Sequence, residues 1–178
     1  MIPPRSRAVV LALTLLSVVL AQGCGADESK QGPPFHPGNI ERPQSLLVTS
    51  GDVEGIGAST PYGVVLGWWR ALQRGDVKGV QRSYAQRVSA GAARRQIRDF
   101  EPRFSQPVEP TEDEGRKRAT VEVVVRAAIR LGDLPNVIGV HDFPASFDLV
   151  RTGAGWRLRA NAYGRYRRAL LDALAAET

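Results

Sequence analysis

Apolar residues recur at three- and four-residue steps after Pro61, which is the spacing of one face of an α-helix. The apolar face consists of Tyr62, Val65, Leu66, Trp68, Trp69 and Leu72. Gly75 ends the pattern, because glycine commonly ends helices in a left-handed backbone conformation. The sequence therefore predicts a first helix that buries a large aromatic face.

Two shorter helical patterns follow. Asp76 is suited to cap the first of them, because its side chain accepts hydrogen bonds from the free backbone N–H groups at a helix start. The apolar face of that helix consists of Val77, Val80, Tyr84 and Val88. The next helix begins after Ser89 and ends before Pro102. Its apolar side consists of Ala93, Ile97 and Phe100, and its other side of Arg94, Arg95 and Arg98.

The second half of the chain changes to a period of two. Every other residue from Val121 to Leu131 is apolar, which is typical of a strand with one buried face. The opposite face of this strand consists of Thr120, Glu122, Arg126 and Arg130. A cluster of turn-forming residues at 132–136 ends the strand.

A second alternation runs from Phe143 to Leu149, and Pro144 predicts an edge or a bulge near its start. The glycine-containing turn at 152–155 then leads into a strand with Trp156, Leu158 and Ala160 on one side, which predicts an antiparallel hairpin. A short basic helix at 165–175 closes the chain. Three helices followed by antiparallel strands indicate an α+β domain.

The N-terminal segment has the organisation of an export signal. Arg5 and Arg7 precede an apolar run from Ala8 to Ala21, and small Gly23 stands directly before Cys24. The apolar run is shorter than the roughly 20 residues that a membrane-spanning helix needs. This arrangement resembles the bacterial lipoprotein signal, although Gln22 departs from its usual pattern. The resemblance implies that residues 1–23 are a signal peptide and that Cys24 becomes the acylated N-terminus of the mature protein.

Residues 24–60 contain many prolines and glycines and almost no periodic apolar pattern, which predicts a flexible tether in which only Leu46, Leu47 and Val48 dock on the domain. Residues 61–178 form the folded domain. Because Cys24 is the only cysteine, no internal disulfide can form, and the fold must depend on packing alone.

The charge balance is basic, with 24 lysines and arginines against 18 aspartates and glutamates. From Pro61 onward the count is 20 against 13. Such an excess attracts anionic lipid headgroups or phosphate-bearing wall polymers. Nucleic acid is not expected as a partner, because an exported lipoprotein rarely meets it. Strand alternation places Arg126 and Arg130 on one outer face, and it places Arg157 and Arg159 on another, so a common anion-binding surface is expected if these strands pair.

The segment from Trp68 to Asp76 and the turn Gly155-Trp156-Arg157-Leu158 resemble the nuclear transport factor 2-like superfamily over about residues 61–163. The resemblance implies a cone of ketosteroid-isomerase type, in which N-terminal helices pack on a curved antiparallel sheet. Members of this superfamily include isomerases and dehydratases as well as non-catalytic domains, so the resemblance leaves the function open.

An isomerase-like site would need a carboxylate base and neutral donors in an apolar pocket. The candidates are Tyr62, Tyr84, Asp99, His141, Asp142 and Asp148. Each has a structural explanation as well: the tyrosines fit the apolar helix faces, Asp148 alternates with apolar neighbours, and the His141-Asp142 pair follows a glycine. No catalytic residue is therefore expected. No metal site or cofactor is expected either, because the spacing of histidine and acidic residues assembles no ligand set.

The sequence predicts a lipid-anchored protein on the extracytoplasmic face of the cell membrane, whose non-catalytic domain binds an envelope protein or a small apolar ligand. The alternative is a small isomerase or lyase with a pocket inside the cone. An open cone containing a buried polar group would favour the enzyme, whereas a cone filled by Trp68, Trp69 and Phe147 would favour the interaction role.

Overall fold

Four antiparallel strands in the order β1-β2-β3-β4 form the sheet of the folded domain. The structure is a computed structural model, and it describes residues 43–130 and 138–176. Residues 1–42, including Cys24 and the expected signal, lie outside the described residues, as does the predicted strand break at 132–136. The helices and the curved antiparallel sheet confirm the predicted α+β class.

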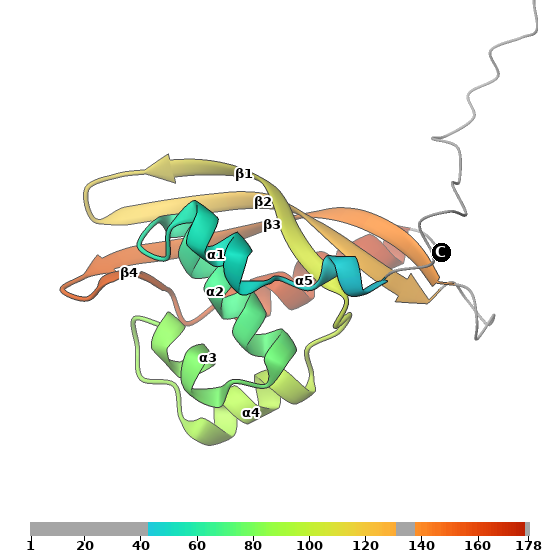
Figure 1. The fold of residues 1–178 in the computed structure, drawn as a ribbon, viewed down its shortest axis with the longest axis horizontal. Helices are drawn as coiled ribbons and strands as arrows, with labels where there is room; N and C mark the ends of the chain where they lie inside the picture. The colour runs from blue at the N-terminus through green and yellow to red at the C-terminus, as the bar shows by residue number, and fades with distance from the viewer. Residues whose placement is uncertain (1–42, 131–137, 177–178) are drawn as a thin grey trace, which may run out of the picture. The chain divides into compact units, whose positions relative to one another are not determined.

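Three consecutive helices pack beside the sheet (Figure 1). Each begins with a side-chain cap. They are α2 (Pro61–Arg74), α3 (Val77–Ser83) and α4 (Ala90–Arg98). Thr60, Asp76 and Ser89 precede them and accept hydrogen bonds from Gly63, Gly79 and Ala92 N–H groups at 2.9 to 3.1 Å. Gly75 ends α2 with a φ of 72°, in the left-handed region that glycine adopts without strain. The three predicted helices are present, but α3 ends at Ser83 instead of continuing to Val88, because Tyr84 is extended and bridges to Leu158.

The predicted strands are also present: the first two are longer than expected, whereas the last ends at Leu158 and leaves Ala160 exposed beyond it. β2 (Arg118–Arg130) pairs with β3 (Ile138–Thr152), which pairs with the short β4 (Gly155–Leu158). The alternating residues from Val121 to Ala127 on β2 and from Phe143 to Leu149 on β3 are buried, as expected. β4 pairs only with Leu149–Thr152, so Pro144 lies where β3 has β2 as its single neighbour, which agrees with the predicted edge.

The strand β1 (Ser105–Glu114) was not predicted from the sequence. It contains two prolines and four acidic residues, and it buries only Ser105 and Pro107. Its register with β2 is interrupted between Val108 and Thr111, where Glu109 has a φ of 51°. An edge strand that is charged and bulged has no apolar alternation to reveal it.

Residues 43–60 differ from the expectation of a flexible tether. They form the 3₁₀ helix η2 (Pro43–Leu46) and the helix α1 (Ser50–Ile56), which begins with a capping box between Thr49 and Asp52. Leu46 and Val48 are buried, which confirms their predicted docking. Gln73 of α2 holds this segment, since its Oε1 accepts from Val48 N at 2.9 Å. Residues 43–60 therefore belong to the folded domain, whose predicted start was Pro61.

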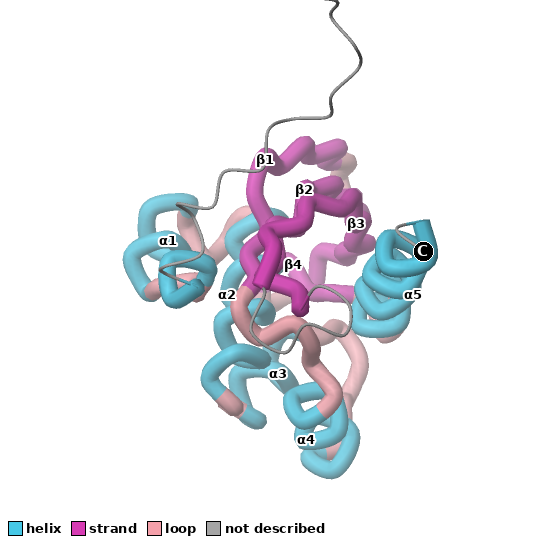
Figure 2. The backbone as a smooth tube through the Cα atoms, turned by 90° about the vertical axis from the view of Figure 1, so that its right-hand side faces the viewer, coloured by secondary structure: helices cyan, strands magenta, loops and turns pink. Residues whose placement is uncertain are grey.

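The last helix, α5 (Ala162–Ala176), packs against β3, while α1 lies on the β1 side of the domain (Figure 2). The aromatic residues of α2 and α5 meet the buried face of the sheet between them. Among the described residues, no helix is both long enough and apolar enough to cross a membrane.

Candidate functional site

The interior that an isomerase-like protein would use as a pocket is filled with aromatic side chains. Trp68 and Phe147 are fully buried, with ring centroids 5.7 Å apart. Trp69 lies 4.9 Å from Tyr166 and 5.4 Å from Phe100. Ser105 is the one buried polar residue apart from tyrosine and tryptophan in the described part of the chain. The side chains expected to decide between an open and a filled interior are thus all in the core.

The two tyrosines considered as catalytic donors, Tyr62 and Tyr84, are core residues with hydrogen bonds of their own. The Tyr62 hydroxyl donates to the carbonyl oxygen of Pro107 at 2.7 Å, and burial raises its pKa to about 12, with a smaller contribution from Asp52. The Tyr84 hydroxyl donates to Gln96 Oε1 at 3.1 Å, and burial also raises its pKa. Both phenols therefore remain neutral at physiological pH.

The three candidate carboxylates lie outside the core, and arginines pair with each of them. Asp99 forms an exposed ion pair with Arg98, whose hydrogen bond lowers the pKa of the Asp99 carboxyl. The other two acids pair with residues of β2 and α5: Asp142 with Arg126 at 2.9 Å, and Asp148 with Arg165 at 2.8 Å. His141 lies on β3 opposite Ala127. No carboxylate base therefore reaches the aromatic interior within the described residues.

The four arginines expected to form a common basic surface are spread along the sheet. Arg126 pairs in register with Asp142, whereas Arg157 pairs with Val150, which lies eight residues farther along β3. At about 3.3 Å per residue, this separation is about 26 Å along the strand. Arg159 lies just beyond β4 and approaches Asp148 at 3.9 Å. Arg130 pairs with Ile138 through its backbone, and its side chain is not described.

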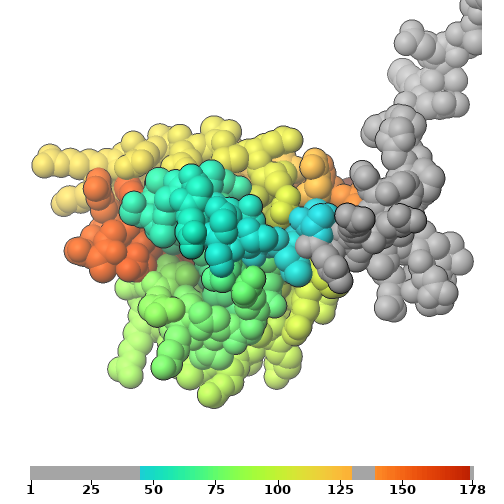
Figure 3. Space-filling view, viewed as in Figure 1, coloured from blue at the N-terminus to red at the C-terminus, as the bar shows by residue number. Residues whose placement is uncertain are grey.

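A different group of arginines lines an open cleft between α1, α2 and α3. The cleft has a volume of about 520 Å³, and its charged lining consists of Arg70, Arg74, Arg82, Arg157 and Asp76. We call this cleft the arginine pocket. Figure 3 looks onto the face where α1 lies next to the surface of α2 and α3. Only Arg157 of the arginines predicted from the sequence belongs to it.

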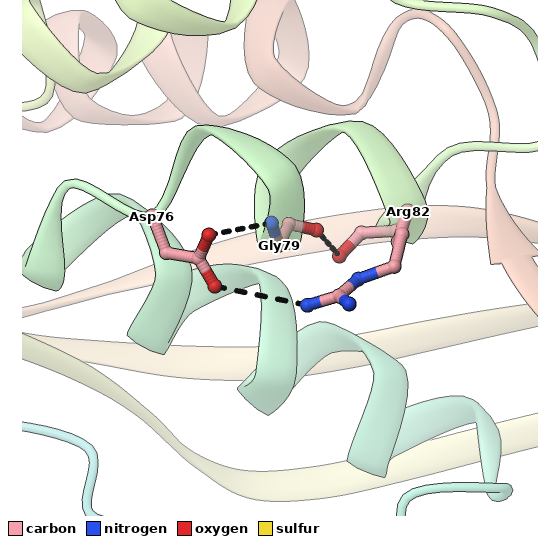
Figure 4. A network of polar contacts seen from close by, with 4 residues as sticks. Asp76, Gly79 and Arg82 are labelled. Carbon is pink, nitrogen blue, oxygen red and sulfur yellow. Dashed lines mark hydrogen bonds and ion pairs between the residues drawn. The ribbon is translucent and has the colours of Figure 1, made fainter.

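Most of the positive charge in the arginine pocket is not balanced by a carboxylate of the described residues. Among the described residues, no carboxylate lies within ion-pairing distance of Arg70, Arg74 or Arg157. Arg82 approaches Asp76 at 3.8 Å, and both side chains are largely exposed. Asp76 also accepts a hydrogen bond from Gly79 N at 2.9 Å as the cap of α3 (Figure 4). Four arginines against one aspartate leave the cleft strongly positive.

Small residues form the floor of the arginine pocket. Gly63, Gly67 and Ala71 recur at four-residue steps along α2 and therefore lie on one helix face. A Cβ atom built at Gly67 would meet no atom within 4 Å, so this position faces open space. The pattern of small residues beside Arg70 and Arg74 was the available signal in the sequence, but Arg82 and Arg157 come from other elements and could not be joined to it.

An apolar crevice of about 410 Å³ lies on the other side of α1, against α2 and β1. Its lining includes Val48, Ile56, Leu66 and Val108, and the exposed Ile56 stands at this surface. The small apolar ligand predicted from the sequence would contact an apolar lining in this crevice. In the part of the chain that the structure describes, no cluster of three histidine, cysteine or acidic side chains could hold a metal ion.

No protein-family model and no curated protein match the chain. Solved structures with a similar arrangement include a ketosteroid-isomerase-like protein from Shewanella frigidimarina, at 17% identity and a TM-score of 0.42, covering 57% of this chain and 93% of that one. A dehydratase-like protein of the NTF2-like family from Streptomyces avermitilis has 15% identity and a TM-score of 0.38, covering 65% and 93%. The similar structures thus include nuclear transport factor 2-like folds. At these values the likeness carries no argument about the function of this chain.

Proposed function

We propose that the chain is an exported, lipid-anchored protein of the cell envelope whose folded domain is a non-catalytic binding module. The filled interior supports the proposal that the domain is non-catalytic. Trp68, Trp69 and Phe147 occupy the space that a substrate would need, and each is fully buried. The exterior of the described residues instead offers open clefts, among them one lined by arginines and one that is apolar.

The anchor part of the proposal is supported by the sequence before Pro43. Cys24 follows a short apolar segment in the manner of a lipoprotein signal, and two acyl chains on such a cysteine anchor a protein stably to a bilayer. Between Cys24 and Pro43 lie 18 residues. These residues would join the acylated Cys24 to the folded domain.

The alternative of a small isomerase or lyase lacks a specific supporting observation. Its chemistry needs a carboxylate base and neutral donors that converge in an apolar cavity. Asp99, Asp142 and Asp148 are instead paired with arginines outside the core. The binding role is therefore the better supported of the two.

Metabolic labelling of the producing bacterium with a fatty-acid analogue tests the anchor. The wild-type protein should carry the label and appear in the membrane fraction, whereas Cys24→Ser should be unlabelled and leave that fraction, because the single thiol is gone. Ser29→Ala is the matched control, since it changes a neighbouring polar residue and keeps the thiol. An unlabelled wild-type protein, or a Cys24→Ser form that is still labelled, would reject lipid anchoring.

A further inference from the structure

We infer that the arginine pocket is a binding site for a phosphate group carried by a small anion or a lipid headgroup. This inference deepens the proposed binding role by naming its ligand class. It does not depend on the lipid anchor, so the two proposals can fail separately.

The arrangement of the arginines gives the pocket a wall and a mouth. Arg70 and Arg157 are half-buried, whereas Arg74 and Arg82 are exposed. The wall residues come from α2 and β4, which are far apart in the sequence, and the cleft brings them together. An anion entering the cleft therefore meets guanidinium groups from separate elements.

The donors of the wall arginines are held in place but not saturated. Arg70 Nη2 donates to Ser50 Oγ at 2.7 Å, while its Nε is buried and has no hydrogen-bond partner in the described structure. Arg157 Nη1 donates to the carbonyl oxygen of Trp156. Neither guanidinium forms an ion pair with a described carboxylate, so an incoming anion would not have to displace one.

The excess charge favours a phosphate group over a single carboxylate. A phosphomonoester carries about −1.5 to −2 charges at neutral pH and offers three acceptor oxygens. Guanidinium groups match such oxygens with paired N–H donors. Four arginines against one aspartate provide more positive charge than a monoanion would neutralise. The ligand chemistry that fits best is therefore a multiply charged oxyanion of the phosphate type.

The pocket also has room for the group. Gly67 on its floor faces open space, and a side chain placed there would enter the cleft without meeting backbone. A leucine at this position would fill ligand space and also improve the helix propensity of α2. Gly67→Leu therefore separates loss of the site from loss of the fold.

Calorimetric titration of the purified full chain in a non-ionic detergent tests the inference, with inorganic phosphate and glycerol phosphate as probes at matched ionic strength. Arg70→Gln should weaken binding about tenfold, because a charge-assisted contact is lost. Arg94→Gln removes the same charge from an exposed position of α4 outside the cleft, and it should leave the affinity unchanged.

Two further variants should change the phosphate affinity in opposite directions. Gly67→Leu should abolish binding while the thermal midpoint is kept or raised. Asp76→Asn removes the single negative charge of the lining and should tighten binding roughly threefold. Asparagine caps helices as well as aspartate does, so α3 should remain intact.

Short-chain phosphatidic acid, whose headgroup is a phosphomonoester like that of glycerol phosphate, is titrated in the same detergent and distinguishes the two sources of phosphate. Tighter binding of this lipid than of glycerol phosphate would identify a headgroup as the source, and the reverse order would identify a soluble or polymeric phosphate. Both results support the inference. It is overturned if no phosphate compound binds, or if Arg70→Gln and Gly67→Leu leave the binding unchanged.

Discussion

Truncation of Trp69 should show how strongly the filled interior stabilises the domain. Trp69 is fully buried and lies edge-on to Phe100 and Tyr166 with centroid distances of 5.4 and 4.9 Å. Its Nε1 donates to the carbonyl oxygen of Ser105 at 2.9 Å. Trp69→Ala therefore removes a central side chain, several aromatic contacts and one hydrogen bond at the same time.

The expected loss in the free energy of unfolding is about 4 to 6 kcal/mol. Truncating a buried tryptophan to alanine loses its hydrophobic burial and leaves a cavity, which together cost about 3 to 5 kcal/mol. The lost hydrogen bond adds about 1 kcal/mol. The Ser105 carbonyl keeps a partner, since Gln73 Nε2 also donates to it at 2.6 Å, so no penalty for an unpaired acceptor is added. Such a loss is a large part of the 5 to 15 kcal/mol that is typical of a domain.

Thermal and urea unfolding of the full chain, followed by circular dichroism, measures this loss. The thermal midpoint should fall by roughly 15 °C for Trp69→Ala. Trp69→Phe keeps an aromatic ring and should lose about 1 to 2 kcal/mol. Leu171→Ala is the control, because Leu171 is exposed on α5 and should cost little. A loss below about 1 kcal/mol for Trp69→Ala would refute the packing described here.

Other consequences follow from the same structure. Burial raises the pKa of all four tyrosines, so the folded protein should show little tyrosinate absorbance at pH 11, whereas the chain in urea should titrate near pH 10. Because the folded-state values are the higher ones, this contribution to stability is complete below about pH 10 and is lost as the pH rises. In unfolding experiments Gly75→Ala should cost about 1 to 2 kcal/mol at its left-handed position, while Gly67→Ala should gain up to about 1 kcal/mol. A double-mutant cycle on the partly exposed pair Arg126 and Asp142 should give less than about 1 kcal/mol of coupling.

Helix starts and the end of α2 could be predicted because local chemistry sets them, whereas the end of α3 at Ser83 was placed too late. Thr60, Asp76 and Ser89 cap helices through side-chain contacts to residues three positions later, and Gly75 ends α2 through its own backbone conformation. These signals depend on a few neighbouring residues. The alternation of β2 and β3 was readable for a similar reason, since one face of each strand is buried and the other is not.

The elements that escaped prediction are those whose stability comes from tertiary contacts. The segment before α2 docks through Leu46 and Val48, and Val48 N donates a hydrogen bond to Oε1 of Gln73, which lies 25 residues away. The strand β1 gains its place by pairing with β2. Neither residues 43–60 nor β1 shows a periodic apolar pattern, so the sequence of each segment resembles that of a loop.

The arginine pocket was hidden for a related reason. Alternation along a strand predicts which face a residue occupies, but it does not predict how far along the sheet that residue lies. Arg126 and Arg157 were expected to lie together and are on different parts of the sheet. Arg157 instead joins Arg70 and Arg82, a grouping set by how α2, α3 and β4 pack.

The most direct test of this account is a backbone NMR titration of the full chain with inorganic phosphate. The titration shows whether phosphate binds at the surface of the domain and not in its aromatic interior. The amide signals of Gly67, Arg70, Gly79 and Arg82 should shift with a common dissociation constant, while those of the buried strand residues around Phe147 should not move. Shifts centred on Phe147 with none at the arginines would contradict the account and indicate an internal pocket.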